Sequence, residues 1–168
     1  MLLSLQEENL IKIFNAAWKI LKVGGWVPLL VFVTHVFISR VLHAYVIWPP
    51  IDIPMHFSGG VAIAYLISQC YQLLPRESVK RSRVVVLELM LIGSLTATTA
   101  VFWEFGEFTV DQLFGSNVQI SLANTMQDLA MGILGSLVFI LIRSRQLHAG
   151  IGELREITYD LIRGQAAL

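Results

Sequence analysis

The sequence predicts an all-α polytopic membrane protein, with four transmembrane helices plus amphipathic N- and C-terminal surface helices. The first observation is composition, because 55% of the 168 residues are hydrophobic and only 14% are charged, whereas about a quarter of a typical soluble chain is charged. The second is a set of four long apolar stretches, each near the roughly 20 residues that cross a bilayer. The third is the placement of Lys and Arg between these stretches. We expect a single membrane domain, residues 1–168, without internal repeats.

Both ends of the chain carry helical stripes. Residues 3–22 have one polar and one apolar stripe, with Trp18 as an anchor, which is typical of a helix lying in the membrane interface. Residues 146–163 carry a similar apolar stripe and are expected to form a second surface helix. The positive charges do not precede a short apolar core, so we interpret the segment after residue 22 as an uncleaved anchor.

The first two spans are bounded by tryptophan and proline. The first, about 26–48, has Trp26 and Trp48 at its ends, where interfacial tryptophans are common. The second, about 52–74, begins at Asp52, which is a candidate N-cap, and ends before Pro75.

The other two spans carry small residues at helical spacing. The third covers about 84–108 and the fourth about 124–142, and we expect them to pack through Gly93, Ala97 and Ala100 against Gly132 and Ser136. A polar loop, Asp111 to Leu122, connects them. Asn124 and Gln127 have the spacing of a capping box at the start of the fourth span.

Lys and Arg fall on alternate sides of these spans. Three of the twelve precede the first span, four lie in residues 75–83 and four follow the fourth span. The remaining one, Arg40, is within the first span. The positive-inside rule therefore predicts a multi-pass protein of the cell (inner) membrane with both termini in the cytoplasm.

Ionisable residues gather in the outer part of the spans, although a charge inside a bilayer costs at least a few kcal/mol. Imidazole and carboxylate without thiolate suit a divalent metal ion such as Zn, Mn, Fe or Mg. Carboxylates held close together also raise one another's proton affinity, which suits acid–base chemistry. The predicted metal ligands are Asp52, His56, Glu104, Glu107 and Asp128, and the predicted catalytic groups are Glu104, His56 and Asp128.

A second set of residues is predicted to bind a substrate: Arg40, His43 and Asn124. The Arg40 guanidinium matches the geometry of a lipid phosphate, or else it pairs with Glu104 to hold helices together. His43 may be read equally as a residue that faces water. Asp52 and Asn124 are read equally as helix caps. His35 is interpreted as a hydrogen-bonding residue of the packed helices.

Three short motifs resemble a known family. Residues 52–60, Asp-Ile-Pro-Met-His-Phe-Ser-Gly-Gly, are similar to the D-x3-H-F-x2-G helix start of the YjdF-like membrane proteins. Residues 103–107 resemble their E-x2-E motif, and residues 124–129 resemble their D-T-x2-D-M segment. A looser resemblance extends to the VanZ-like proteins. The resemblance covers about residues 45–142 and implies an integral membrane protein whose site residues are Asp52, His56, Glu104, Glu107 and Asp128.

The leading hypothesis is a small integral membrane protein whose outward-facing site, with a bound metal ion, binds or modifies an envelope lipid or lipid-linked molecule. Both binding and catalysis fit this pattern. The alternatives are an ion- or proton-coupled transporter, for which a homo-oligomer would supply a path, and a structural protein without catalysis. A net charge of zero gives no indication of nucleic-acid binding, and the single cysteine, Cys70, excludes a disulfide framework.

Overall fold

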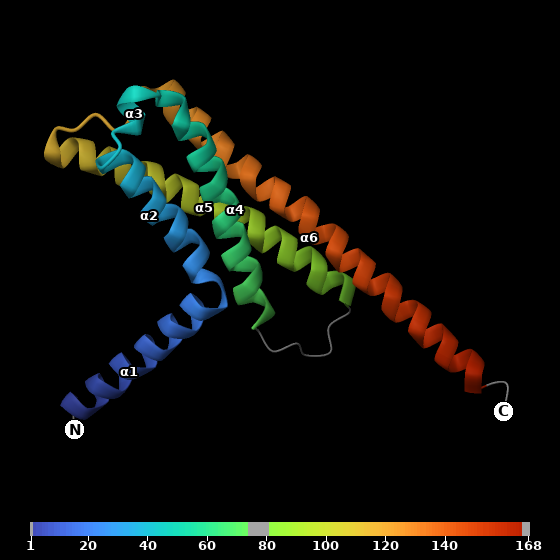
Figure 1. Cartoon of the computed structure of the whole chain (residues 1–168). Coiled ribbons are helices and arrows are strands. Elements are labelled where there is room, and N and C mark those ends of the chain that lie inside the picture. The colour runs from blue at the N-terminus through green and yellow to red at the C-terminus, as the bar shows by residue number, and fades with distance from the viewer. Residues whose placement is uncertain (1, 74–80, 166–168) are drawn as a thin grey trace.

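Every regular element is a helix in a computed structural model that describes residues 2–73 and 81–165, and the side chains of residues 11–73 and 85–149 (Figure 1). In the described part 91% of residues are helical and none is in a strand, which confirms the predicted fold class. Four helical stretches are long and apolar enough to cross a membrane: Ile11–Arg40, Pro49–Gln72, Val85–Phe114 and Leu122–Ala149.

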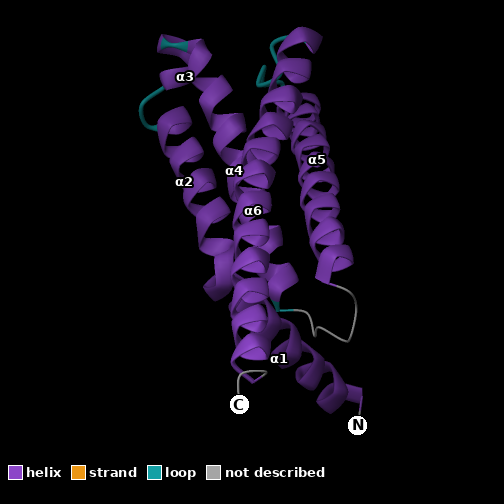
Figure 2. Cartoon of the chain, turned by 90° about the vertical axis from the view of Figure 1, so that its right-hand side faces the viewer, coloured by secondary structure: helices purple, strands orange, loops and turns teal. Residues whose placement is uncertain are grey.

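The helices α2 (Trp26–Arg40), α4 (Asp52–Gln72), α5 (Arg81–Phe114) and α6 (Leu122–Gln165) form a bundle. Figure 2 shows α1 (Leu2–Ile20) and the later part of α6 at the bottom of this bundle, which we call its lower end. Residues 41–51 and 115–121 lie at the opposite, upper end. Successive helices of the bundle therefore run in alternating directions, and the first and last helices extend to the same side, as expected for four membrane crossings.

The first span ends earlier than the sequence predicts. Helix α2 stops at Arg40 rather than near Trp48, and a short helix α3 (Ala44–Ile47) follows. His43 lies between them with φ of 48° in the left-handed region. A left-handed residue cannot continue a right-handed helix, so the chain turns here.

Helix α1 (Leu2–Ile20) is joined to α2 by a π-helical turn, Leu21–Gly25, rather than by a loop. The chain bends sharply at this turn, so that α1 points away from the bundle (Figure 1). Bends of this kind are typical of π-turns and glycine pairs, and Gly24 and Gly25 stand here. Residues 11–20 are exposed along their whole length, and the side chains of residues 3–10 lie outside the described part.

Helices α5 and α6 are both longer than predicted. Helix α5 continues to Phe114, so Asp111 belongs to its last turn and not to the following loop. The Asp111 carboxylate accepts hydrogen bonds from Ser116 Oγ and from the backbone N–H groups of Val118 and Gln119, at 2.6, 2.8 and 2.9 Å. These bonds hold the short connection against the end of α5.

Helix α6 passes through residue 142 without interruption, so the predicted C-terminal surface helix is a continuation of the fourth span. Its side chains from residue 150 onward lie outside the described part, as does the loop that begins at Pro75.

The closest approach in the bundle is between α4 and α6. A Cβ atom at Gly60 would collide with the carbonyl oxygen of Gly132, and one at Gly135 with the carbonyl oxygen of Phe57. The predicted contact of α5 with α6 also forms, since a Cβ at Gly132 would lie 3.5 Å from Ala100 Cβ. Small residues thus let both α4 and α5 pack closely against α6.

Replacing Gly60 by alanine should destabilise the bundle by about 1–3 kcal/mol, because the new methyl group forces two backbones apart. Gly59→Ala is the matched control, since a Cβ there meets nothing within 4 Å and alanine favours a helix by about 0.5–1 kcal/mol. The measurement is thermal unfolding in detergent. Equal melting temperatures for the two variants would contradict this packing.

The lower end of the bundle contains a buried ion pair. Glu88 is 1% exposed, and its Oε1 accepts hydrogen bonds from Arg143 Nε at 2.7 Å and from Ser68 Oγ at 3.0 Å. The observed pair ties α4, α5 and α6 together.

Candidate functional site

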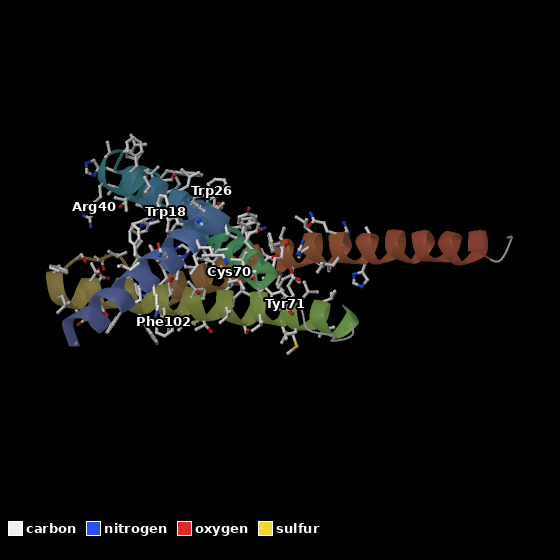
Figure 3. The ribbon with its side chains drawn as sticks, turned by 90° about the horizontal axis from the view of Figure 1, so that it is seen from below. Trp18, Trp26, Arg40, Cys70, Tyr71 and Phe102 are labelled. Atoms are coloured by element: carbon white, nitrogen blue, oxygen red, sulfur yellow. The ribbon has the colours of Figure 1, made fainter. Side chains whose placement is uncertain are left out.

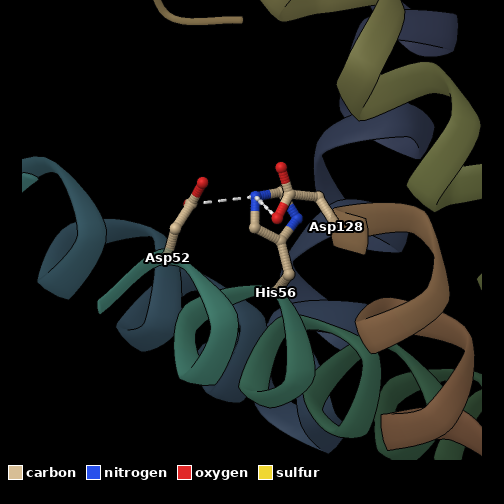
Figure 4. Close-up of side chains that lie close together, drawn as sticks. All are labelled: Asp52, His56 and Asp128. Atoms are coloured by element: carbon tan, nitrogen blue, oxygen red, sulfur yellow. Dashed lines mark ion pairs between the residues drawn. The ribbon is translucent and has the colours of Figure 1, made fainter. Parts of the chain in front are cut away.

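His56 lies at the centre of a cluster of carboxylates in the upper part of the bundle (Figure 4). It stands one turn into α4 after Asp52, so both side chains share a helix face. The distance from His56 Nε2 to Asp52 Oδ1 is 3.2 Å, and to Asp128 Oδ1 of α6 it is 4.0 Å. The close contact of α4 with α6 therefore brings Asp128 opposite the imidazole.

Asn124 connects the two aspartates. Its Nδ2 donates to Asp128 Oδ2 at 2.7 Å and lies 3.4 Å from Asp52 Oδ2. Neither residue acts as a helix cap: Asp52 makes no capping hydrogen bond at the start of α4, and Ser121 Oγ, which accepts from the Asn124 backbone N–H at 3.2 Å, caps α6. The capping interpretation of Asp52 and Asn124 is therefore wrong, and both side chains belong to the cluster.

The third helix contributes Glu104 and Glu107 to the other side of the imidazole. Glu104 Oε1 lies 3.8 Å from His56 Nδ1. Glu104 Oε2 accepts a hydrogen bond from Gln119 Nε2 at 3.1 Å, and Glu107 Oε1 accepts one from Trp103 Nε1 at 2.7 Å. Glu104 is thus held from the loop 115–121, and Glu107 from its own helix.

The five predicted ligands come together, but they divide into two sets that share His56. One set is Asp52, His56 and Asp128; the other is His56, Glu104 and Glu107. In each set one ligand atom per residue lies within 4.8 Å of the others. An imidazole offers one nitrogen to each ion, so each set could hold its own metal ion.

The cluster contains buried carboxylate oxygens that lack a hydrogen-bond donor. Glu104 and Asp128 are 4% and 2% exposed, and among the side chains that the structure describes, the atoms Glu104 Oε1 and Asp128 Oδ1 find no hydrogen-bond partner. A buried acceptor without a donor normally costs about 1–3 kcal/mol, more for a charged group. Both atoms are the ones that face the His56 ring, and the donor set of imidazole nitrogen and carboxylate oxygen fits a divalent cation.

Two predicted substrate residues lie apart from the cluster. Arg40 and His43 are exposed, and Figure 3 shows Arg40 projecting outward from the end of α2. Among the side chains that the structure describes, no ion pair joins Arg40 to Glu104, so the alternative of a helix-holding pair is wrong.

His35 forms the hydrogen bond that its interpretation requires. Its Nδ1 lies 2.7 Å from Tyr45 Oη, and its ring meets Trp103 edge to face with centroids 5.6 Å apart. Burial, with a smaller contribution from Asp52, raises the pKa of the Tyr45 phenol, so it remains protonated in this bond. Through Trp103 this pair supports Glu107.

An apolar pocket of about 140 Å³ lies beside the cluster, between α2, α4 and α5. His56 is at its upper end and Thr96 is deeper in the bundle. Phe32 and Trp103 meet edge to face across it, with centroids 6.0 Å apart. The sequence does not predict this pocket, because the residues that line it are of the kinds found throughout transmembrane helices.

The fold and this cluster define a class: a four-span membrane protein with a buried histidine and acid site. A family model described as "Predicted membrane protein (DUF2238)" matches residues 12–149, and the chain belongs to this family. The predicted resemblance to the YjdF-like proteins, which are this family, is confirmed, whereas the looser resemblance to the VanZ-like proteins is not supported. Neither a curated protein nor a solved structure gave a match.

Proposed function

We propose that the cluster around His56 binds a divalent metal ion and that the protein binds or modifies an envelope lipid or a lipid-linked molecule on the outer side of the cell membrane. The observation that carries the proposal is the pair of buried oxygens, Glu104 Oε1 and Asp128 Oδ1, that lack a hydrogen-bond donor and face the two ring nitrogens of His56. A metal ion would satisfy either oxygen.

Charge supports this proposal over a purely structural role. Four carboxylates surround one imidazole within the cluster, and a protonated imidazole would contribute only a single positive charge. A divalent cation offsets more of the mutual repulsion between buried carboxylates, which is large where water is excluded. A structural cluster would be expected to pair its acids with arginine, as Glu88 does with Arg143 at the lower end.

Depth supports a lipid headgroup as the target. Asp128 lies six residues after the start of α6, about 9 Å along the helix axis. Glu104 lies ten residues before the end of α5, about 15 Å along the axis, but it faces the same imidazole as Asp128, so α5 extends further past the cluster than α6 does. A polar group near the membrane surface reaches these depths, and Arg40, exposed at the same end, would bind its phosphate.

The proposed roles follow from burial and partners. Bound metal would supply a Lewis acid and an activated water. Asp52 and Asp128 with His56 would hold it, positioned by Asn124. Glu104, which faces the other ring nitrogen of His56, would exchange a proton with the bound molecule, while Gln119 fixes its second oxygen.

A second candidate function, a proton-coupled transporter, is favoured by one observation. The hydroxyl groups of Thr96 and Ser136 are buried without a hydrogen-bond partner, in the region between the His56 cluster and the Glu88–Arg143 pair. The inner half of the bundle therefore holds polar groups in addition to Glu88. Proton flux into proteoliposomes that Thr96→Val removes would favour this function.

The experiment that tests the proposed function compares lipid extracts, by mass spectrometry, from cells that produce the parent protein, Glu104→Gln or His56→Ala. We expect lipid species that change with the parent and not with either variant. The exposed Gln112 is not in the cluster, so Gln112→Ala is the control and should act as the parent does. Variants that change the extracts as much as the parent would contradict a role for the cluster.

A further inference from the structure

We propose that the pocket between α2, α4 and α5 holds an acyl chain of a glycerophospholipid, with the headgroup end of the chain at His56. This inference rests on the proposed function and names the class of lipid that the site receives. The pocket and the predicted metal site share one residue, His56; the other residues that line the pocket are not predicted metal ligands.

The chemistry of the pocket walls points to a hydrocarbon occupant. Its walls are made by Met55, Gly59 and Ile63 of α4, Val31 and Phe32 of α2, and Ala100 of α5. In a membrane, this apolar pocket of about 140 Å³ would have lipid chains around it, which are the available molecules of matching polarity. Methylene groups placed in it would gain packing contacts with its walls.

Two of the pocket's lining rings reach the outer surface of the bundle, which would face the bilayer. Phe32 and Trp103, which face each other across it, are 46% and 37% exposed. Helix α2 packs on α4 and reaches α5 through these rings, so an entrance would lie between α2 and α5. Two rings this close would restrict the width of a passage between them, which would suit an unbranched acyl chain better than a branched prenyl chain.

The dimensions place the two ends of the chain. From Thr96 to Trp103 the pocket follows α5 for seven residues, about 10 Å along the helix axis. It begins at His56 and Trp103, beside the carboxylates, and extends toward the middle of the bilayer. A chain in this position holds the polar end of its lipid next to the cluster.

Glycine provides a matched pair of variants. A Cβ atom at Gly59, in the pocket wall, or at Gly106, outside the pocket on α5, meets nothing within 4 Å. Gly59→Phe should fill the pocket, whereas Gly106→Phe adds the same side chain elsewhere. Thr99→Phe fills the pocket from α5 and serves if Gly59→Phe does not fold.

The test is native mass spectrometry of detergent-purified protein titrated with dipalmitoyl phosphatidylglycerol, with metal content measured on the same samples. We expect one tightly retained lipid in the parent and in Gly106→Phe, and retention lower by about tenfold or more in a folded pocket-filling variant, because the displaced methylenes lose their burial. Equal retention by all variants, or preference for a polyprenyl phosphate, would overturn the inference.

The same samples separate the two proposals. Lipid retained in the parent and lost on filling the pocket, without any metal, would support the acyl-chain site and contradict the metal function. Metal bound by the parent without retained lipid would overturn the acyl-chain site and leave the metal function standing.

Discussion

Removing divalent ions with a chelator should lower the melting temperature of the protein by about 5–10 °C. A ligand present at 100 times its dissociation constant stabilises the folded state by about 2.7 kcal/mol, and each kcal/mol shifts the melting temperature of a chain of this size by about 2–4 °C. The physical reason is that Asp52, Asp128 and Glu104 regain their mutual repulsion around His56 when the cation leaves. Thermal unfolding in detergent, before and after chelation, measures the effect.

Adding the metal back should restore the melting temperature of the parent. His56→Ala removes the ligand that both sets share, so its melting temperature should not respond to chelator or metal. A response of His56→Ala equal to that of the parent would place the stabilising ion elsewhere in the protein.

Replacing Arg143 by methionine should reduce the free energy of unfolding by about 3–5 kcal/mol, because Glu88 would be left as a buried charge without a partner. Methionine keeps much of the length of the arginine side chain, so the loss reports mainly the missing charge. Reversible unfolding by titration with sodium dodecyl sulfate measures this free energy.

Two further variants complete this test. The double variant Glu88→Leu, Arg143→Met removes both charges and should recover most of the stability, since apolar pairs of similar volume often replace buried ion pairs at little cost. Arg145→Met, at an exposed position of α6, should change stability by less than about 0.5 kcal/mol. A double variant as unstable as Arg143→Met would show that the ion pair is not the cause.

Much of the cluster could be predicted from the sequence because depth in a membrane follows from position along a span. Asp52 and His56 begin one helix, Glu104 and Glu107 come near the end of another, and Asp128 follows the start of a third. Since the spans alternate in direction, these positions meet at one end of the bundle. Apolar length and charge placement thus predict both the helices and the level of the site.

The ends of helices could not be predicted as well, because tertiary contacts decide them. Helix α5 passes Phe108 and ends only after Asp111, whose carboxylate binds the next connection. The break after Arg40 depends on the left-handed conformation of His43. This conformation could not be predicted, because the position is not occupied by glycine, the residue that usually adopts it.

The hydrogen-bond partners of the cluster also could not be predicted from the local sequence. Gln119 reaches Glu104 across 15 residues, and Asn124 reaches Asp52 across 72. No periodic pattern marks such contacts, which exist only once α4, α5 and α6 have packed. The pocket is a further case, since its shape depends on how far α2 stands from α5.

The most direct measurement is the metal content of detergent-purified parent protein by elemental mass spectrometry, beside Glu104→Gln and His56→Ala. The proposed site predicts near-stoichiometric Zn, Mn, Fe or Mg in the parent, loss of the ion in His56→Ala, and reduced content in Glu104→Gln. A parent that binds no divalent ion under any loading condition would contradict the proposal and leave the cluster as a set of protonated or hydrated carboxylates.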